Sequence, residues 1–257
     1  MRRAALVLGL ALALLFSAVP ASAEEAILSF EGRVRVLRNG SLDVTEILAV
    51  RAEGKVFRHG IFRDFPTDYQ DRLGNTVRVG FAVKAVRLDN EPEDWFEEPI
   101  PAGRRVYIGS KTRRLSRGVH RFELSYVTSR QVGFFADHDE LNWNVTGSGW
   151  ILPLEHVRAV IEPPGEVLET VAWTGPPGSR ESAAREFREN HTVIFETTRA
   201  LAPGEGLTVA VAWPKGLVPE PAVQDKARGL FGDNAPALIA LAGFVAVFAY
   251  YMIAWTL

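Results

Sequence analysis

Two segments of the sequence gather residue types that could do chemistry. Residues 58–66 interleave basic and apolar side chains, and residues 133–150 gather acids, amides, a histidine and aromatics. The second segment holds carboxylates at i, i+2 and i+3 and then an amide, namely Asp137, Asp139, Glu140 and Asn144. Calcium takes six or more such oxygen ligands, although the spacing differs from that of an EF-hand loop. Calcium binding is therefore an alternative here and not the first expectation.

The same acids have a second interpretation as partners in ion pairs. Arg58 and Arg63 of the first segment could pair with them and pin a loop across the domain. Charge clusters in loops are more often structural or solvated than functional. We therefore expect a binding or structural ion-pair loop and no metal. The candidate residues are Arg58, Arg63, Asp137, His138, Asp139, Glu140, Trp143, Asn144 and Trp150.

A metal-dependent enzyme would use Asp139 or Glu140 as a general base beside His138. The sequence contains no Gly-x-Ser-x-Gly elbow, no Walker loop and no His-Glu-x-x-His motif to accompany that base. Ser148 lies between two glycines, which is the composition of a turn. We therefore expect no catalytic residue and no cofactor, and keep a metal-dependent envelope enzyme as the alternative.

Aromatic residues are concentrated where we expect loops. Such residues either fold back over the core or, if several are exposed together, form a binding surface. We expect them mostly to cover the core. The residues are Trp95, Phe96, Phe134, Phe135, Trp143 and Trp150.

Both segments resemble a family of predicted bacterial membrane proteins, the domain of unknown function 2207. Its Gly-Ile-x-Arg-x-Phe-Pro pattern is matched by Gly60, Ile61, Arg63, Phe65 and Pro66. Its second pattern is matched by Gly133, Phe134, Phe135, Asp139, Glu140, Trp143, Asn144, Gly147 and Trp150. The resemblance covers nearly the whole chain and implies a signal peptide, an exported β-rich domain and a membrane anchor, with no established activity. Family members usually continue past their first membrane helix.

The elements that position these segments are mostly strands. Residues 27–37 and 41–50 alternate apolar and polar side chains around Asn39-Gly40, which predicts a β-hairpin. Only residues 180–189 could form a short helix. Further strands are expected at 76–88, 104–109, 119–127, 157–161, 168–173, 192–197 and 207–213.

The spacing of these strands determines the fold class that we expect. Many short strands separated by turn residues predict a mainly β protein with an antiparallel β-sandwich. The absence of βαβ alternation argues against a nucleotide-binding α/β fold. The sandwich is expected to cover residues 24–218, and a Pro/Gly-containing stalk should follow at 219–236.

Residues 237–257 carry no charge and no proline. As a helix they would be about 31 Å long, which is close to the thickness of the bilayer hydrocarbon. We expect a single transmembrane helix that contacts lipid along its length. Tyr250, Tyr251 and Trp255 would lie at one membrane interface, and a further alternative is a subunit of a larger integral membrane complex.

Residues 1–23 have the features of a signal peptide. Arg2 and Arg3 precede an apolar stretch at 4–16, and Ala21-Ser22-Ala23 supplies a small-x-small cleavage site before Glu24. The predicted topology is an N-terminal domain outside the cytoplasm and an anchor in the bacterial plasma (inner) membrane.

Composition excludes several function classes. A formal net charge of −2 argues against a nucleic-acid partner. The absence of cysteine excludes disulfides, zinc–thiolate sites and a cysteine nucleophile. The sequence therefore predicts a binding or assembly module of the bacterial envelope, whose partners are the bilayer and an unidentified envelope or membrane protein.

Overall fold

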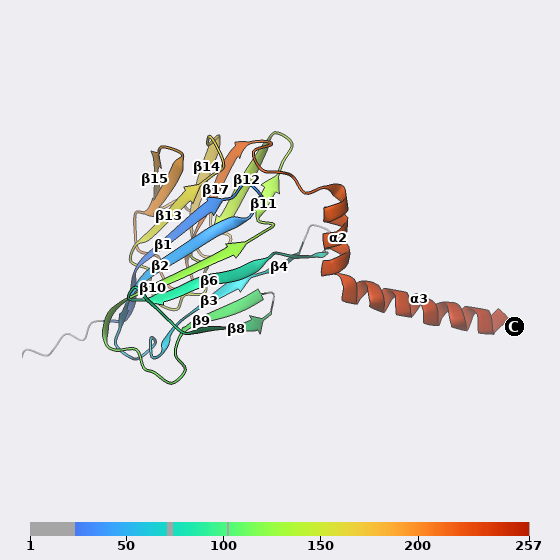
Figure 1. Cartoon of the computed structure of the whole chain (residues 1–257), viewed down its shortest axis with the longest axis horizontal. Coiled ribbons are helices and arrows are strands. Elements are labelled where there is room, and N and C mark those ends of the chain that lie inside the picture. Colours follow the sequence, from blue (N-terminus) through green and yellow to red (C-terminus); the bar gives the residue numbers. More distant parts are fainter. Residues whose placement is uncertain (1–23, 71–73, 102, 257) are drawn as a thin grey trace, which may run out of the picture.

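The structure is a computed structural model that describes residues 24–70, 74–101 and 103–256. The predicted signal peptide and Leu257 lie outside the described residues. The chain forms a β-rich domain from which a long helix extends at one end (Figure 1). The mainly β fold with one C-terminal apolar helix is therefore confirmed.

An eight-stranded sheet forms the largest layer. Its strands, from edge to edge, are β15 (Ala184–Glu189), β16 (Thr192–Thr197), β13 (Val157–Glu162), β1 (Ala26–Val36), β2 (Leu42–Ala52), β10 (Gly118–Thr128), β6 (Phe81–Leu88) and β7 (Glu91–Pro92). β1 and β13 pair in parallel, whereas the other pairs of this sheet are antiparallel. The sheet is therefore mixed, whereas the sequence predicts antiparallel sheets.

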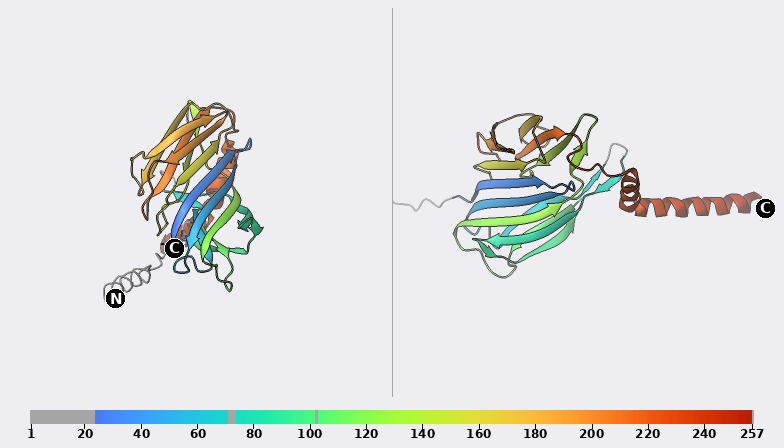
Figure 2. Two further views of the ribbon diagram at one scale, coloured as in Figure 1. Left: turned by 90° about the vertical axis from the view of Figure 1, so that its left-hand side faces the viewer. Right: turned by 45° about the horizontal axis from the view of Figure 1, so that its top comes forward.

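Three smaller antiparallel sheets complete the domain, and Figure 2 shows how they lie around the large one. The four-stranded sheet has the order β11 (Val132–Phe134), β12 (His138–Asn144), β17 (Gly206–Pro214) and β14 (Glu169–Gly175). The three-stranded sheet has the order β3 (Gly60–Pro66), β9 (Gly103–Gly109) and β8 (Trp95–Ile100). A short hairpin pairs β4 (Asp68–Gln70) with β5 (Thr76–Arg78).

The core lies between the large sheet and the smaller ones. Alternate residues of β2 and β10 are buried, as period-two strands with one face covered require. Phe122, Leu124 and Tyr126 lie on the buried face of β10. They belong to one continuous core with Val106 of β9 and Trp213 of β17. The three larger sheets therefore fold around a shared core.

The β1–β2 hairpin confirms the local prediction. Gly40 has φ +79°, a value that favours glycine, and the Asn39 side chain accepts the amide hydrogen of Ser41 at 3.0 Å. The prediction of a short helix at 180–189 is wrong, because β15 pairs along its length with β16. Pairing with a neighbouring strand has outweighed local helix propensity there.

The segment after β2 is held by a buried carboxylate. Glu25 accepts backbone N–H groups from Glu53 at 2.8 Å, Lys55 at 3.0 Å and Val56. Burial by itself would raise the pKa of Glu25, but these N–H groups together lower it below its ordinary value. Glu25 thereby fixes the connection that leads from β2 into β3.

We expect Glu25→Gln to lower the free energy of unfolding by about 1.5–3 kcal/mol at neutral pH, the range for hydrogen bonds to a charged group. Because the folded-state pKa is lowered, the stabilisation is complete above the unfolded pKa of about 4.3 and is lost as pH falls through the folded value. Urea unfolding from pH 7 to pH 3 should show the two proteins converging in acid. A difference that stays constant over this range would contradict the assignment.

Two helices follow β17. α2 (Val223–Asp233) occupies most of the segment predicted as a stalk, and α3 (Ala235–Thr256) corresponds to the predicted membrane helix. Among the described residues, α3 is the one helix long and apolar enough to cross a membrane. Figure 1 shows α3 pointing away from the domain and α2 turned across its line.

Candidate functional site

Arg63 on β3 is the centre of the candidate site. Its side chain is buried, with 6% of the residue exposed. Nε and Nη2 donate to the two carboxylate oxygens of Glu46 at 2.6 and 3.0 Å. Nη1 donates to the carbonyl oxygen of Thr146 at 2.7 Å. Glu46 lies on β2 and Thr146 follows β12, so one guanidinium group joins the three large sheets.

Neighbouring groups complete this cluster. The Tyr126 hydroxyl donates to Glu46 at 3.0 Å, and the indole N–H of Trp150 donates to Thr146 O at 2.9 Å. The rings of Phe30, Phe65 and Trp150 lie 5.2, 5.3 and 5.2 Å from the guanidinium carbon, within the range of cation–π attraction.

The protonation states in the cluster are fixed by their surroundings. Burial by itself would lower the pKa of Arg63, but the charge and hydrogen bonds of Glu46 raise it above its ordinary value. Burial raises the pKa of Tyr126 well above its usual range, and the charge of Glu46 adds to this effect. Arg63 is therefore cationic, and Tyr126 remains a hydrogen-bond donor at neutral pH.

A cavity of about 300 Å³ lies beside the cluster. One wall is β3, which contributes Gly60, Ile61, Phe62, Arg63, Asp64 and Pro66, and the opposite wall is residues 147–152. Ile61 and Arg63 are buried whereas Phe62 and Pro66 are exposed, so these pairs lie on opposite faces of the strand. Because residues of both faces line one cavity, the edge of β3 itself must face it.

This edge of β3 is open. In the three-stranded sheet β3 pairs with β9 alone, and no strand of the described chain pairs with its other edge. Pro66 lacks a backbone N–H and suits the end of an edge strand. The remaining N–H and C=O groups along this edge are available to another extended segment.

A second cavity of about 280 Å³ continues along the same strand. The two cavities share Arg63, Asp64, Pro66, Asn144 and Gly147. They are therefore two compartments of one groove, which we call the β3 groove and define as the open edge of β3 together with residues 142–144 and 147–152.

The outer face of β3 is also held in place beside the groove. Asp64 accepts two hydrogen bonds from Arg105, at 2.6 and 2.7 Å, and the Arg105 guanidinium lies 4.1 Å from the centre of the Phe62 ring. The hydrogen bonds with Asp64 raise the pKa of Arg105 above its ordinary value. Both faces of the strand are thus fixed while its edge is left open.

Three of the predicted site residues lie in the groove besides Arg63. Trp150 forms part of the wall, Trp143 lines the second compartment, and Asn144 lines both. The Asn144 side chain also accepts the amide hydrogen of Gly147 at 3.0 Å, which shapes the turn after β12. Arg58 lies outside the groove, where its Nε donates to Lys55 O.

The predicted acidic loop is largely a strand. β12 begins at His138, so Asp139 points to the buried side of the strand and Glu140 to the other side. Asp139 is paired with Lys215 at 3.3 Å, and Asp137 contacts His138 at 2.7 Å. The expected pairing of Arg63 with these acids is not formed, because its guanidinium group already pairs with both carboxylate oxygens of Glu46. The described residues contain no group of three His, Cys, Asp or Glu side chains arranged to hold a metal.

Most of the aromatic residues expected in loops lie on strands instead. Trp95 and Phe96 are on β8, Phe134 is on β11 and Trp143 is on β12. The hairpins that hold them were not recognised as strands from the local sequence. Phe135 does lie in the turn between β11 and β12, where it stacks on His138 at 4.7 Å.

Sequence analysis missed two members of the cluster, Glu46 and Tyr126. A usable signal was present for Glu46, which follows Leu42 and Val44 at intervals of two and so occupies an inward position of its strand. An acid at such a position requires a buried partner. The pattern does not identify that partner, which comes from another sheet.

The comparisons with known proteins bear on the same segments. A sequence model described as the N-terminal domain of a predicted membrane protein (DUF2207) matches residues 26–213. The chain belongs to this family. The match spans the domain from β1 to β17 and includes the whole β3 groove. A search of curated proteins found no match to the DUF2207 chain.

The solved structures with partial similarity to the DUF2207 domain include a hydrolase and a zinc metallopeptidase. Native leukotriene A4 hydrolase from yeast aligns with a TM-score of 0.48 and 11% identity, over 73% of this chain and 29% of that one. An M1 zinc metallopeptidase from Deinococcus radiodurans aligns with a TM-score of 0.41 and 15% identity, over 72% of this chain and 42% of that one. The chain spans less than half the length of either protein.

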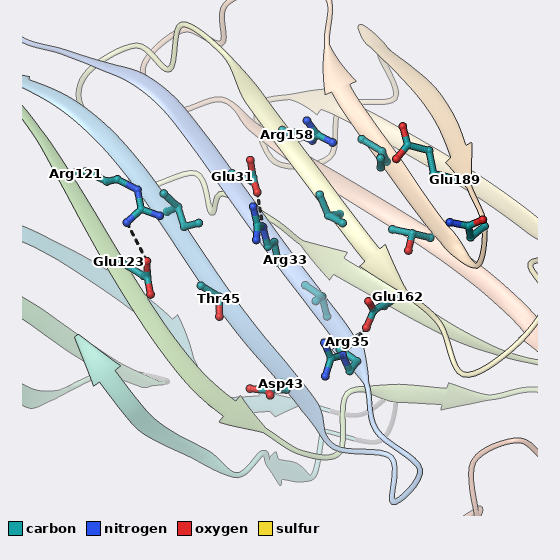
Figure 3. Close-up of a pocket in the computed structure, with 16 residues that line it drawn as sticks. Glu31, Arg33, Arg35, Asp43, Thr45, Arg121, Glu123, Arg158, Glu162 and Glu189 are labelled. Carbon is teal, nitrogen blue, oxygen red and sulfur yellow. Dashed lines mark hydrogen bonds and ion pairs between the residues drawn. The ribbon is translucent and has the colours of Figure 1, made fainter. Parts of the chain in front are cut away.

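A further cavity of the DUF2207 domain, about 700 Å³, lies on the outer face of the eight-stranded sheet. Figure 3 shows its charged side chains standing in rows across neighbouring strands. Arg33 pairs with Glu31, and Arg121 pairs with Glu123 at 2.9 Å. Exposed pairs of this kind each contribute about 0–1 kcal/mol. We interpret this face as a solvated surface.

We expect neither millimolar calcium nor EDTA to change the unfolding temperature of the DUF2207 chain. The reason is that Asp139 is already held by Lys215, on the opposite side of β12 from Glu140. Occupation of a site at 100 times its dissociation constant would instead add about 2.7 kcal/mol. A calcium-dependent rise that disappears in Asp139→Ala would restore the metal interpretation.

Proposed function

We propose that this chain is a membrane-anchored binding module of the bacterial envelope, and that it captures an extended peptide segment of a partner protein in the β3 groove. The segment would add as a strand to the open edge of β3. In this proposal the domain lies outside the cytoplasm and α3 anchors it in the plasma membrane.

The observation that carries the proposal is the open edge of β3 facing a cavity. A peptide that pairs with a strand edge gains main-chain hydrogen bonds, while its alternate side chains enter pockets on the two sides. The β3 groove offers both features, since the edge is unpaired and Phe62 and Ile151 present exposed apolar surface beside it. Such apolar surface beside a few fixed polar groups is typical of binding sites.

The buried cluster supports this function by making the groove rigid. The Arg63 guanidinium donates to Glu46 on β2 and to the carbonyl oxygen of Thr146, which is the residue next to the opposite wall. The strand and the wall therefore keep a fixed separation before any ligand arrives, which reduces the entropy lost on binding. An anchor in the same membrane as the partner would raise the partner's effective concentration.

The test uses random decapeptides displayed on phage and selected against the full chain in nanodiscs. We expect selected peptides whose affinity falls about tenfold or more in Phe62→Ala and in Ile151→Ala, because each change removes apolar contact area. Phe187→Ala on β15 is the matched control, since Phe62 and Phe187 are each 45% exposed and Phe187 lies outside the groove.

Strand addition makes a second, sharper demand on the same peptides. Only alternate N–H groups of an added edge strand face its partner. Synthetic peptides N-methylated at one set of alternate residues should therefore lose binding, whereas methylation of the other set should leave it intact. Equal effects of the two sets, or binding as sensitive to Phe187→Ala as to Phe62→Ala, would exclude the proposed mode.

A further inference from the structure

α2 is an amphipathic helix. Its apolar side is not buried against any other part of the described chain. Val223, Ala227, Leu230 and Phe231 fall at i, i+4, i+7 and i+8 and so share one side of the helix. Val223 is 82% exposed and Phe231 is 61% exposed. A single exposed apolar residue needs no explanation, but a continuous apolar side does.

A different side of α2 is fixed to the domain. Asp233 accepts the backbone N–H of Arg78 at 3.0 Å and the Arg130 guanidinium at 2.7 Å. The guanidinium of Arg130 also lies against Gly229, where an added Cβ would come within 3.0 Å of it. At 100° per residue, the side of Gly229 and Asp233 is about 125° around the helix from the apolar side.

Asn234 fixes the end of α2 in the same place. Its side chain accepts the N–H of Thr76 at 2.9 Å and donates to Thr76 O at 3.0 Å, so it pairs with β5 in the manner of a neighbouring strand. The same amide group donates to Leu230 O at 2.9 Å. The position and the rotation of α2 relative to the domain are therefore set.

α3 begins at Ala235, and Asn234 is the single residue between it and the end of α2. At about 1.5 Å per residue, Leu230 and Phe231 lie within about 8 Å of the point where the chain enters the apolar helix. Figure 1 shows α2 turned across the line of α3, and Figure 2 shows the same arrangement from a second direction. If α3 crosses the bilayer, a helix that turns across the line of α3 just before its first residue lies along the bilayer surface.

We infer that α2 is an interfacial helix, with Val223, Leu230 and Phe231 inserted at the boundary between lipid headgroups and acyl chains. Interfacial helices bury their apolar side about 5–10 Å into this boundary and keep charged residues on the other side. Asp225 and Arg228 occupy that polar side. The inference rests on α3 crossing the bilayer, and it orients the domain with the β4–β5 hairpin toward the membrane.

The absence of cysteine makes the test direct, because a single introduced cysteine carries the only label. Nitroxide-labelled full chains with Val223→Cys, Phe231→Cys, Asp225→Cys or Arg228→Cys are reconstituted into vesicles of phosphatidylethanolamine and phosphatidylglycerol. Phe244→Cys in α3 serves as the lipid-exposed reference. Paramagnetic resonance then measures collisions of each label with oxygen, which favours lipid, and with a water-soluble nickel chelate.

We expect the ratio of oxygen to nickel collisions to be several-fold higher at positions 223 and 231 than at 225 and 228, and highest at 244. Equal ratios at the four α2 positions would overturn the inference. So would labels at 223 and 231 that are shielded from both reagents and broadened by a second spin, because that result means contact with another copy. Each labelled chain should retain the unfolding temperature of the unlabelled protein, since all four α2 positions are exposed.

Discussion

Glu46→Gln is expected to lower the free energy of unfolding by about 3–5 kcal/mol, the range for removing one partner of a buried ion pair. The substitution keeps the shape of the side chain but leaves the buried Arg63 charge without its counter-ion. The cation–π contacts and the single bond to Thr146 O do not replace a bidentate carboxylate. Urea unfolding of the full chain at neutral pH measures the difference.

Two further variants separate the charge effect from a general loss of packing. Asp43 lies on β2, the same strand as Glu46, and forms an exposed ion pair with Lys84 of β6. Asp43→Asn removes this pair and should change the free energy of unfolding by less than about 1 kcal/mol. The double variant Glu46→Leu/Arg63→Met replaces both charges with apolar groups and should recover much of the stability lost in Glu46→Gln. If Glu46→Gln is as mild as Asp43→Asn, the buried pair does not hold the sheets together.

Gly60→Ala is expected to destabilise the protein by about 3–5 kcal/mol and to abolish peptide binding in the β3 groove. Gly60 has φ +142°, and a Cβ there would lie 1.8 Å from the carbonyl oxygen of Ile108 on β9. The unfavourable φ costs about 1–3 kcal/mol, and forcing the two backbones apart adds about 1–3 kcal/mol. The separation would begin where β3 enters the groove.

Gly54→Ala is the matched control for this prediction. Gly54 also has a positive φ, +80°, but an added Cβ there meets nothing within 4 Å. It should therefore show the cost of φ alone, about 1–2 kcal/mol. Equal destabilisation by the two substitutions would mean that β3 and β9 can separate without loss, contrary to the close approach of their backbones.

The sequence predicted the parts of this fold that depend on neighbouring residues. The β1–β2 hairpin follows from period-two alternation and an Asn-Gly turn, both of which act within about twenty residues. Residues 180–189 show the limit of such reasoning, because the strand β15 depends on its pairing with β16. Propensity alone does not encode which neighbour a segment finds.

The candidate site was predicted in the same partial way. Residues 58–66 and 133–150 were singled out by composition, and the structure does bring them together at Arg63. Glu46, the counter-ion, lies in neither segment, and its pairing with Arg63 is created by the packing of one sheet on another. The sequence predicts a loop for the acids at 137–140. The structure instead begins β12 at His138, and strand alternation places Asp139 and Glu140 on opposite sides of that strand.

The position of Glu25 has a consequence for how the chain is processed. Its carboxylate fixes the start of β1 at the end of the domain opposite to α3 (Figure 1). β1 has 11 residues and so is about 36 Å long, whereas the eight residues 17–24, even fully extended, reach about 28 Å. If residues 1–23 act as the predicted signal peptide and the domain stands in the membrane with β1 along the line of α3, a leader that stayed attached could not place its apolar stretch in the bilayer that holds α3 while the domain stayed folded. Folding and retention of the leader would thus compete, and we expect signal peptidase cleavage before Glu24 to be what allows the domain to stand free of the membrane at that end.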